Sequence, residues 1–358
     1  MSVLYSGSTL KINLKAIADN YFILKAKAGG REIAAVVKAN AYGLGVEKVA
    51  PVLKEAGCKL FFVANLDEAL ELREILPSSD IAVLNGVIKG QGKFFAENNI
   101  IPVLNSMEQI DLWSKTFNQK PSMIHVDSGM NRLGIPIDEY EKVINSGKLE
   151  KLNVKLILSH LACADEKKNT KNVEQLNIVR KVAELTPNFK ISFANSSGIF
   201  LGKDYHFDIV RPGIALYGGN PIPNSLNPMK NVVEITANIL QIRNIDSEET
   251  VGYGATYILD KGSKIATLPI GYADGYFRVF GNRSYCAING KKVPVVGRVS
   301  MDLITIDITS IKDEINIGDE VEILGANVKL DELVELAETI DYEVLTSLGS
   351  RYRRIYTN

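Results

Sequence analysis

The sequence has little of several features that narrow the class of a protein early. Lys and Arg number 41 against 42 Asp and Glu, which gives a formal net charge of −1. A chain so close to neutral has no excess of positive charge for nucleic acid or an anionic membrane. No apolar run approaches the roughly 20 residues of a membrane span. The opening MSVLYSGSTLKINLKA lacks the apolar stretch of a signal peptide. We therefore expect a cytoplasmic protein with neither a nucleic-acid nor a membrane partner.

Cysteine is also scarce. Cys58, Cys163 and Cys286 are widely spaced, odd in number and without a CxxC pair. This pattern excludes a disulfide framework, and we expect no metal site. Hydrophobic residues make up 46% and charged residues 23% of the chain, as in ordinary folded domains. The length of 358 residues suggests about two domains, although one large barrel is also compatible.

Short apolar runs alternate with helical patterns over the first two thirds of the chain. Alternating strands and helices predict a parallel sheet covered on both faces, which makes the fold class α/β. Eight such runs are the number that closes a (β/α)8 TIM barrel, and an open doubly wound sheet is the alternative. The runs span residues 32–39, 59–65, 81–86, 100–105, 123–129, 156–162, 191–197 and 208–214.

The pattern changes near residue 225. The segment PIPNSLNPMK carries three prolines in ten residues and is typical of a linker. Closely spaced β runs follow, joined by Gly and Asn turns, among which NGKK is typical of a hairpin. One amphipathic helix is expected at 330–340.

The predicted domains follow from this change. We expect a barrel at 10–225 and a mostly β C-terminal domain at 226–358, with residues 1–9 as an added N-terminal strand. The alternating segment TLKINLKA (9–16) could pair with either domain.

Polar residues follow several of the predicted barrel strands. Active-site groups of such barrels gather at the carboxyl ends of the strands. Lys38 lies at the carboxyl end of the first expected strand, where it could be a nucleophilic amine that forms a Schiff base. It could equally be a lysine whose stem lies along apolar surface. The fifth expected strand ends in HVDSGMNRLG, which places Asp127 and Arg132 close to the mouth, and the sixth ends in SHLACAD, which contains His160.

The loops after strands seven and eight are the usual phosphate site of barrel enzymes. ANSSG offers hydroxyls and backbone amides, and RPGIALYGG offers more amides and the cation Arg211. A lysine on the first strand together with this cradle suits pyridoxal 5′-phosphate (PLP). In the second domain, tyrosines crowd among glycines in GYGATY (252–257) and GYADGYFR (271–278). Such clusters serve either core packing or acid–base chemistry.

Eight motifs occur in the order in which they stand in one enzyme family. They are VVKANAYG, HVDSGMNRLG, SHLACADE, ANSSG, VRPGIALYG, GYGATY, LPIGYADGY and VGRVSMD. From about Leu10 to Arg354 the chain resembles the alanine racemase family. This resemblance implies a fold-type III PLP enzyme with a barrel, a C-terminal β domain and a head-to-tail homodimer. It also implies interconversion of L- and D-alanine, which supplies D-alanine for cell-wall peptidoglycan.

The resemblance implies roles for individual residues. Lys38 matches the lysine that holds PLP and acts as the base on the D-alanine face. Tyr253 matches the base for L-alanine, which is contributed across the dimer. His160 would lie between Tyr253 and Arg211. Arg211 would face the pyridine nitrogen and keep it unprotonated, because an arginine stays charged.

Further contacts are implied for the cofactor and the substrate. Arg132 matches the residue that binds the phenolic oxygen of PLP and helps with the substrate carboxylate. Asp302, which follows Met301 in the sequence, could support the groups around the substrate. The phosphate contacts map to Tyr42, Ser196, Gly213 and Ile214, and the substrate contacts from the partner subunit map to the Met301 backbone and Tyr272.

Three positions depart from the family pattern. Many relatives carry a carbamylated lysine where this chain has His125, so we expect no carbamate here and another means of orienting Arg132. Leu44 replaces a histidine, which concerns only the rim of the site. Ser350 stands in place of a tyrosine that usually contacts the phosphate, so either Tyr352 takes over this role or the contact is lost.

Other functions remain compatible with the residues. A broader racemase could act on serine and other small amino acids with the same scaffold. A non-catalytic PLP carrier is a second alternative, but such proteins lack a C-terminal β domain that bears a tyrosine. Fold-type III decarboxylases are a third, and they usually carry a cysteine where VGRVSMD has Ser300.

Overall fold

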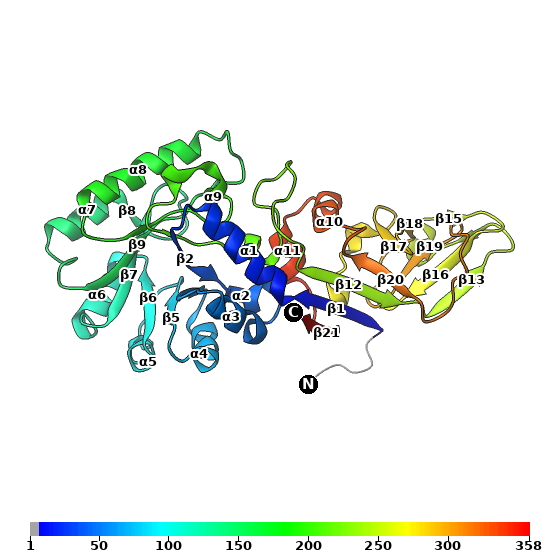
Figure 1. Cartoon of the computed structure of the whole chain (residues 1–358), viewed down its shortest axis with the longest axis horizontal. Coiled ribbons are helices and arrows are strands. Elements are labelled where there is room, and N and C mark those ends of the chain that lie inside the picture. The colour runs from blue at the N-terminus through cyan, green and yellow to red at the C-terminus, as the bar shows by residue number, and fades with distance from the viewer. Residues whose placement is uncertain (1–6) are drawn as a thin grey trace. The chain divides into compact units, whose positions relative to one another are not determined.

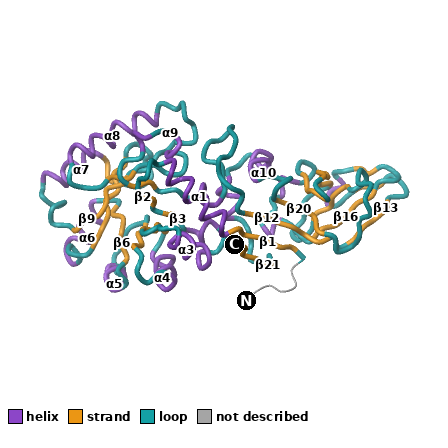
Figure 2. The backbone as a smooth tube through the Cα atoms, viewed as in Figure 1, coloured by secondary structure: helices purple, strands orange, loops and turns teal. Residues whose placement is uncertain are grey.

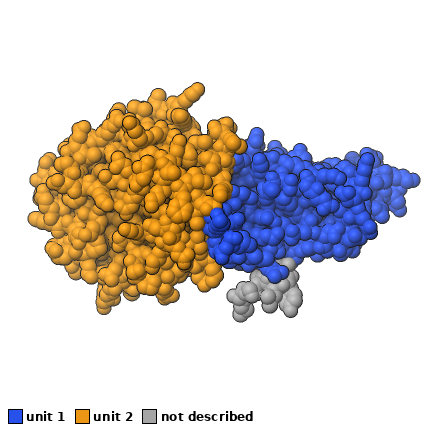
Figure 3. All heavy atoms as spheres, in the orientation of Figure 1, with its two compact units in different colours: residues 1–16, 231–358 blue, residues 17–230 orange. Residues whose placement is uncertain are grey.

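The computed structural model describes residues 7–358, and the chain divides into two compact units (Figures 1 and 3). The barrel unit comprises residues 17–230, and the β unit comprises residues 1–16 and 231–358. Residues 1–6 of the expected N-terminal strand lie outside the described part. Among residues 7–358, no helix combines the length and the apolar character that crossing a membrane requires.

The barrel unit contains a parallel sheet that closes on itself. Its strand order is β2-β11-β10-β9-β7-β6-β5-β4-β3. The end strands β2 and β3 follow one another along the chain, and the Ala34 amide between them donates to the Val210 carbonyl at 2.9 Å. Counted as one strand, they complete the predicted eight-stranded barrel. The strands are β2 (Glu32–Ile33), β3 (Ala35–Val36), β4 (Leu60–Val63), β5 (Asp80–Val83), β6 (Ile100–Leu104), β7 (Pro121–Asp127), β9 (Asn153–Leu158), β10 (Ile191–Ser192) and β11 (Ile209–Val210), and β8 (Ile135–Pro136) pairs with β7 alone.

Helices flank the strands of the barrel unit (Figure 2). In α3, Val46, Val49, Ala50 and Leu53 are buried, which is the spacing of one helical face. Side-chain caps begin two further helices, because the Asn65 and Ser106 oxygens each accept an amide hydrogen three residues on. The helices are α1 (Leu14–Lys27), α2 (Lys38–Tyr42), α3 (Val46–Glu55), α4 (Leu66–Ile75), α5 (Gly92–Glu97), α6 (Met107–Thr116), α7 (Ile137–Asn145), α8 (Lys171–Leu185) and α9 (Gly198–Leu201).

The barrel strands end earlier than their apolar runs predict. Strands β4 and β6 are buried at every position, as continuous apolar runs covered on both faces require. The first run was expected to be extended to residue 39, but its strand ends at Val36. The runs at 191–197 and 208–214 form only two strand residues each. The remaining residues of these runs are loops at the mouth of the barrel, which is where the candidate site residues stand.

The β unit is built on a nine-stranded sheet of order β13-β16-β19-β18-β17-β20-β12-β1-β21. Strand β1 pairs antiparallel with β12 and parallel with β21. These pairings place the segment 9–16, which could have paired with either domain, in the β unit. The strands are β1 (Ser8–Asn13), β12 (Val233–Asn238), β13 (Gln241–Asn244), β16 (Lys264–Leu268), β17 (Tyr285–Ile288), β18 (Lys291–Val296), β19 (Ile304–Asp307), β20 (Glu320–Leu324) and β21 (Arg353–Thr357), and β14 (Glu249–Thr250) pairs with β15 (Ile258–Leu259).

The observed unit boundaries differ from the expected domain limits of 10 and 225. They fall after Ala16 and after Lys230. Residues 10–16 belong to the β unit because the ladder of β1 with β12 and β21 extends through Asn13. The Asn13 amide also donates to the Val232 carbonyl at 2.9 Å.

One turn and one helix of the β unit form where the sequence predicts them. Strands β17 and β18 form the predicted hairpin, with Asn289 at φ 50° and Gly290 at φ 76° in the two-residue turn. The helix expected at 330–340 is α10 (Leu330–Ala337), and it ends where Glu338 adopts a left-handed conformation. A further helix, α11 (Asp341–Thr346), follows it.

Candidate active site

Lys38 lies at the carboxyl end of the first barrel strand and opens a left-handed turn. The four residues that follow it, 39–42, all have φ between 52° and 55°. Left-handed backbone costs roughly 1–2 kcal/mol for each residue other than glycine. Strain of this kind persists only where the surroundings enforce it, and it gathers at functional sites.

Two polar side chains hold this turn. Glu68 accepts the Ala39 amide at 2.8 Å and the Ala64 amide at 2.7 Å, so it ties the turn to the end of β4. Asn40 accepts the Val46 amide at 2.8 Å through its own side chain. These bonds hold the backbone of the turn that begins at Lys38.

The environment of Lys38 favours its neutral amine. Desolvation lowers the pKa of Lys38, the positive charge of Arg132 lowers it further, and Glu68 opposes both. A neutral amine is the form that can attack a carbonyl carbon or accept a proton.

Arg211 is a buried cation, only 4% exposed. Its Nη1 donates to the Ser192 hydroxyl and its Nη2 to the Ser159 carbonyl. Among residues 7–358 no carboxylate forms an ion pair with it. Burial lowers the pKa of Arg211 to about 10, so it remains charged at neutral pH. The barrel mouth thus holds a fixed positive charge whose counter-charge is not a side chain of the described part.

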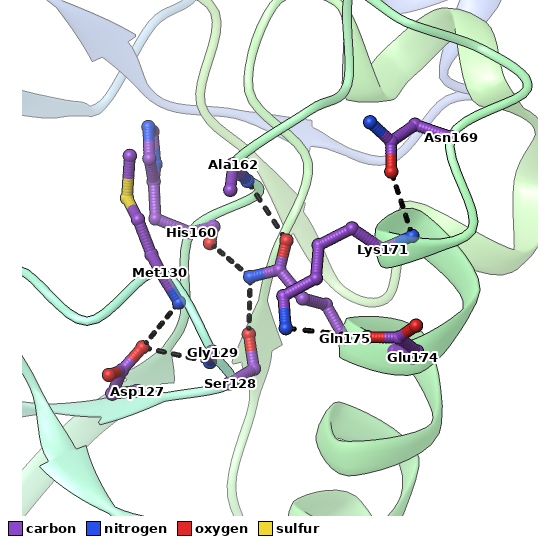
Figure 4. A network of polar contacts seen from close by, with 10 residues as sticks. All are labelled: Asp127, Ser128, Gly129, Met130, His160, Ala162, Asn169, Lys171, Glu174 and Gln175. Atoms are coloured by element: carbon purple, nitrogen blue, oxygen red, sulfur yellow. Dashed lines mark hydrogen bonds and ion pairs between the residues drawn. The ribbon is translucent and has the colours of Figure 1, made fainter.

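His160 follows β9 and is held through its backbone. Gln175 of α8 donates to the His160 carbonyl at 2.9 Å and to the Ser128 hydroxyl at 3.0 Å, and it accepts the Ala162 amide at 2.9 Å (Figure 4). Desolvation, followed by the charges of Arg211 and Arg132, holds the pKa of His160 well below its ordinary value. His160 is therefore neutral at physiological pH.

A cradle of amides and hydroxyls lies after β10 and β11. The Ser196 hydroxyl accepts the Gly213 amide at 3.0 Å and the Ala215 amide at 3.2 Å. The Ile214 amide between them has no acceptor among residues 7–358. A Cβ at Gly213 would lie 2.2 Å from the Tyr42 hydroxyl oxygen, so only glycine leaves room at this point. The arrangement suits an anion that accepts several hydrogen bonds.

Arg132 stands on an exposed loop that Asp127 anchors. The Asp127 carboxylate accepts the amides of Gly129 and Met130 at 2.9 Å and that of Asn131 at 3.0 Å, and the first two bonds are drawn in Figure 4. The Arg132 guanidinium has no ion pair or hydrogen bond within the described residues. It is close enough to Lys38 and His160 to lower the pKa of both.

The β unit brings two of its predicted residues together. Tyr272 follows Gly271, whose missing Cβ would lie 2.3 Å from the Met301 carbonyl oxygen. The Tyr272 amide donates to the Ser300 carbonyl, and the Ala273 amide donates to the Met301 carbonyl, both at 3.1 Å. Tyr253 stands on a separate short helix, η3 (Tyr253–Ala255). The side chains of Tyr253, Tyr272 and Met301 are 73%, 44% and 53% exposed.

The structure also places the residues that depart from the family pattern. Leu44 is fully buried. Ser350 is exposed, whereas Tyr352 is 2% exposed within the β unit, and burial raises the pKa of Tyr352. The Tyr352 hydroxyl is therefore a core group rather than a surface ligand. His125 is partly buried in β7, where its Nδ1 lies 2.7 Å from the Asn105 side-chain oxygen.

Sequence reasoning missed several residues that hold the site in place. Gln175 is fully buried on the apolar face of α8, and Asn105 is 5% exposed directly after β6. A polar residue within an apolar helical face, or at the end of a barrel strand, is a signal that could have identified each. Arg351 carried no such signal, because its partner Asp274 lies 77 residues away in sequence.

The mouth of the closed barrel presents a desolvated amine together with anion-binding amides. This combination is typical of barrel enzymes that use a phosphate-bearing aldehyde cofactor.

Comparison with known proteins narrows this class. The family model of the alanine racemase N-terminal domain matches residues 12–221, and that of the C-terminal domain matches residues 232–356. The chain therefore belongs to the alanine racemase family.

Individual relatives match nearly the whole chain. The alanine racemase of Rickettsia akari is 46% identical over 97% of this chain and 98% of its own length. That of Rhodospirillum rubrum is 44% identical over 97% of this chain and 95% of its own length. The crystal structure of alanine racemase from Bartonella henselae, with covalently bound pyridoxal phosphate, is 43% identical with a TM-score of 0.94. It covers 99% of this chain and 100% of its own.

Proposed function

We propose that this protein is a PLP-dependent isomerase that interconverts L- and D-alanine. The observation that carries the proposal is the pairing of Lys38 with the Ser196–Ile214 cradle at the mouth of one barrel. Desolvation lowers the pKa of Lys38 and so favours its neutral amine. The neutral amine is the form required of a nucleophile and base. The likeness to alanine racemases over 97% of the chain gives the substrate. The product D-alanine would supply cell-wall peptidoglycan, and we place the enzyme in the cytoplasm.

The residues at the barrel mouth fit PLP. The Ile214 amide, which has no acceptor in the described part of the chain, and the Tyr42 hydroxyl that closely approaches Gly213 suit its phosphate. The Lys38 amine suits its aldehyde, and Arg132 its phenolic oxygen. When bound, PLP supplies an electron-withdrawing ring that acidifies the α-proton of the amino acid.

We assign the two proton-transfer roles to Lys38 and Tyr253. Racemisation requires that a proton leave one face of Cα and another arrive on the opposite face. Lys38 Nζ would exchange the proton on the D-alanine face, and the Tyr253 hydroxyl that on the L-alanine face. Tyr272 and the Met301 backbone would border the substrate beside Tyr253.

Arg211 and His160 set the charge at the ring side of the cofactor. The pKa of Arg211, about 10, keeps its guanidinium charged at neutral pH, so it would give no proton to the ring nitrogen. An unprotonated ring withdraws electrons more weakly, which favours return of the proton to Cα over side reactions. His160 stays neutral, and it would relay the electrostatic effect of the Arg211 charge toward the Tyr253 hydroxyl.

We further propose a head-to-tail homodimer with shared sites. Tyr253 is 73% exposed in the β unit, and a base must stand in a site closed to water to be effective. A second copy that contributes Tyr253, Tyr272 and Met301 to the barrel mouth would complete the site. The near-neutral net charge of −1 supports the expectation of neither a nucleic-acid nor a membrane partner.

One experiment tests the proposed activity against its alternatives. The holoenzyme is incubated with single L-amino acids in deuterated water, and deuterium at Cα is followed together with optical rotation. We expect exchange and loss of rotation with alanine and far slower change with serine. Equal rates on serine would establish the broader racemase, and release of carbon dioxide would establish a decarboxylase. PLP binding without exchange would establish a carrier.

A further inference from the structure

Asn105 determines which ring nitrogen of His125 carries the proton. The Asn105 Nδ2 donates to the Leu84 carbonyl at 2.9 Å and to the Val103 carbonyl at 2.8 Å. Both amide hydrogens are thereby used, and only the acceptor Oδ1 is left to face the ring. His125 Nδ1 lies 2.7 Å from this oxygen, so Nδ1 must be the donor. In the neutral imidazole, Nε2 is then a bare acceptor.

The position of Asn105 is itself well determined. It directly follows β6, whose Leu104 pairs with Ile124 of β7, so Asn105 and His125 are the next neighbours along this ladder. Asn105 is 5% exposed, and its backbone amide donates to Gln109 Oε1 at 2.8 Å. A side-chain nitrogen that donates to two carbonyls, on a residue whose backbone is also held, has no freedom to flip toward the ring.

The surroundings of His125 keep it neutral. Desolvation and the charges of Arg211 and Arg132 lower its pKa to about 4, against the opposing effect of Asp127. A proton added at Nε2 would place a third cation beside two arginines. At physiological pH the Nε2 lone pair is therefore free to accept a hydrogen bond.

The free edge of the ring faces the loop that carries Arg132. A Cβ at Gly134 would lie 3.1 Å from His125 Cδ2, the carbon bonded to Nε2. Gly134 has φ 106°, where other residues are strained, and the chain turns there to pair β8 with β7. Arg132 is two residues before this turn. Among residues 7–358, no group donates to His125 Nε2, and Arg132 binds no acceptor.

We propose that His125, oriented by Asn105, is the positioning residue for Arg132. A hydrogen bond between these two side chains is not formed in this structure. When PLP is bound, the Arg132 guanidinium would donate to His125 Nε2 and be held toward Lys38. This proposal rests on the proposed function. An uncharged acceptor, His125 Nε2, would then stand where many relatives carry a carbamate. The mouth therefore keeps one positive charge more than a carbamate would leave, which favours the neutral form of Lys38.

The tautomer can be tested without altering the protein. The chain has three histidines, His125, His160 and His206, so holoenzyme labelled with ¹⁵N-histidine gives few ring signals. The His125→Met variant assigns those of residue 125. We expect a protonated Nδ1 and an unprotonated Nε2 from about pH 5 to about pH 8. A protonated Nε2, or titration near the ordinary histidine value, would overturn the proposal.

A double-mutant cycle tests whether His125 acts through Arg132. The equilibrium dissociation constant of PLP is measured by dialysis for His125→Met and His125→Gln, each with Arg132 and with Arg132→Ala. A hydrogen bond to a charged group predicts that His125→Met weakens PLP binding about tenfold. The same change in the Arg132→Ala background should have less than about a twofold effect. His125→Gln retains an acceptor and should keep most of the affinity.

The outcomes separate this proposal from a merely structural role. An equal loss in both backgrounds would show that the ring acts by packing. Equal losses in the Gln and Met variants would show that no acceptor is needed. Should His125→Met fail to fold, the spectrum of the unaltered holoenzyme still decides the tautomer. An unaltered enzyme that binds no PLP or leaves alanine unchanged would refute the proposed function instead.

Discussion

Arg351 donates two parallel hydrogen bonds to the Asp274 carboxylate, from Nε at 2.7 Å and from Nη2 at 2.8 Å. Its remaining nitrogen, Nη1, donates to Asp302 at 2.6 Å. Asp274 closes the short helix that begins with Tyr272, and Asp302 follows Met301. One guanidinium thus fixes the spacing of the two segments that carry the proposed substrate contacts.

Arg351→Lys should loosen these two segments. A lysine offers a single charged nitrogen and cannot form the parallel pair of bonds that Asp274 receives. Asp274 is buried, but Arg351 is about half exposed, so water compensates part of the loss. We expect the free energy of unfolding in urea to fall by about 1–2 kcal/mol. The KM for alanine should rise, whereas the dissociation constant of PLP should not change.

The matched control is Asp302→Asn, because Asp302 is 56% exposed and its pair with Arg351 is weaker. Its effect on unfolding should stay below about 1 kcal/mol. A loss as large as that of Arg351→Lys would contradict the assignment of Asp274 as the principal partner.

Tyr253→Phe tests the base on the L-alanine face. The change removes one hydroxyl from a side chain that is 73% exposed in the β unit, so the fold and PLP binding should persist. Loss of a proton-transfer group predicts a fall in kcat of about 100-fold or more. Retained PLP absorbance together with unchanged turnover would refute the role, and Tyr257→Phe serves as the control on a neighbouring tyrosine.

The limits of sequence reasoning are clearest at the barrel mouth. Apolar runs correctly located the buried strands, because burial on both faces demands them. They could not show that the run ends in a left-handed turn after Lys38, because non-glycine residues disfavour that conformation and the contacts of Glu68 and Asn40 enforce it. The role of Asn105 could not be predicted because its partners lie apart in the sequence, Leu84 directly after β5 and His125 in β7. Motifs therefore predicted chemical groups, and only the structure supplied the side chains that orient them.

Gly213→Ala tests the phosphate cradle. The backbone at Gly213 has φ −122° and ψ −87°, a combination outside the main regions open to other residues, so an added methyl acts through both backbone strain and lack of space. It would lie 2.2 Å from the Tyr42 hydroxyl oxygen and push that ring or the 213–215 amides out of place. We expect PLP affinity, measured by dialysis, to fall about tenfold or more. Gly213→Ala combined with Tyr42→Ala removes the clash but keeps the backbone strain and loses a proposed ligand, so it should restore part of the folding stability and not the affinity.

The depressed pKa of His125 predicts how stability depends on pH. Its pKa is about 4 in the folded protein against 6.5 in the unfolded chain. Between these values the unfolded chain binds more protons, so the free energy of unfolding falls as the pH falls from about 6.5 to about 4. A shift of this size corresponds to about 3 kcal/mol. His125→Gln cannot titrate, so its urea unfolding should lose less stability over this interval than that of the unaltered enzyme. Ser350→Ala, at an exposed position that does not ionise, should keep the unaltered slope, and an equal slope in His125→Gln would show that His125 is not held neutral.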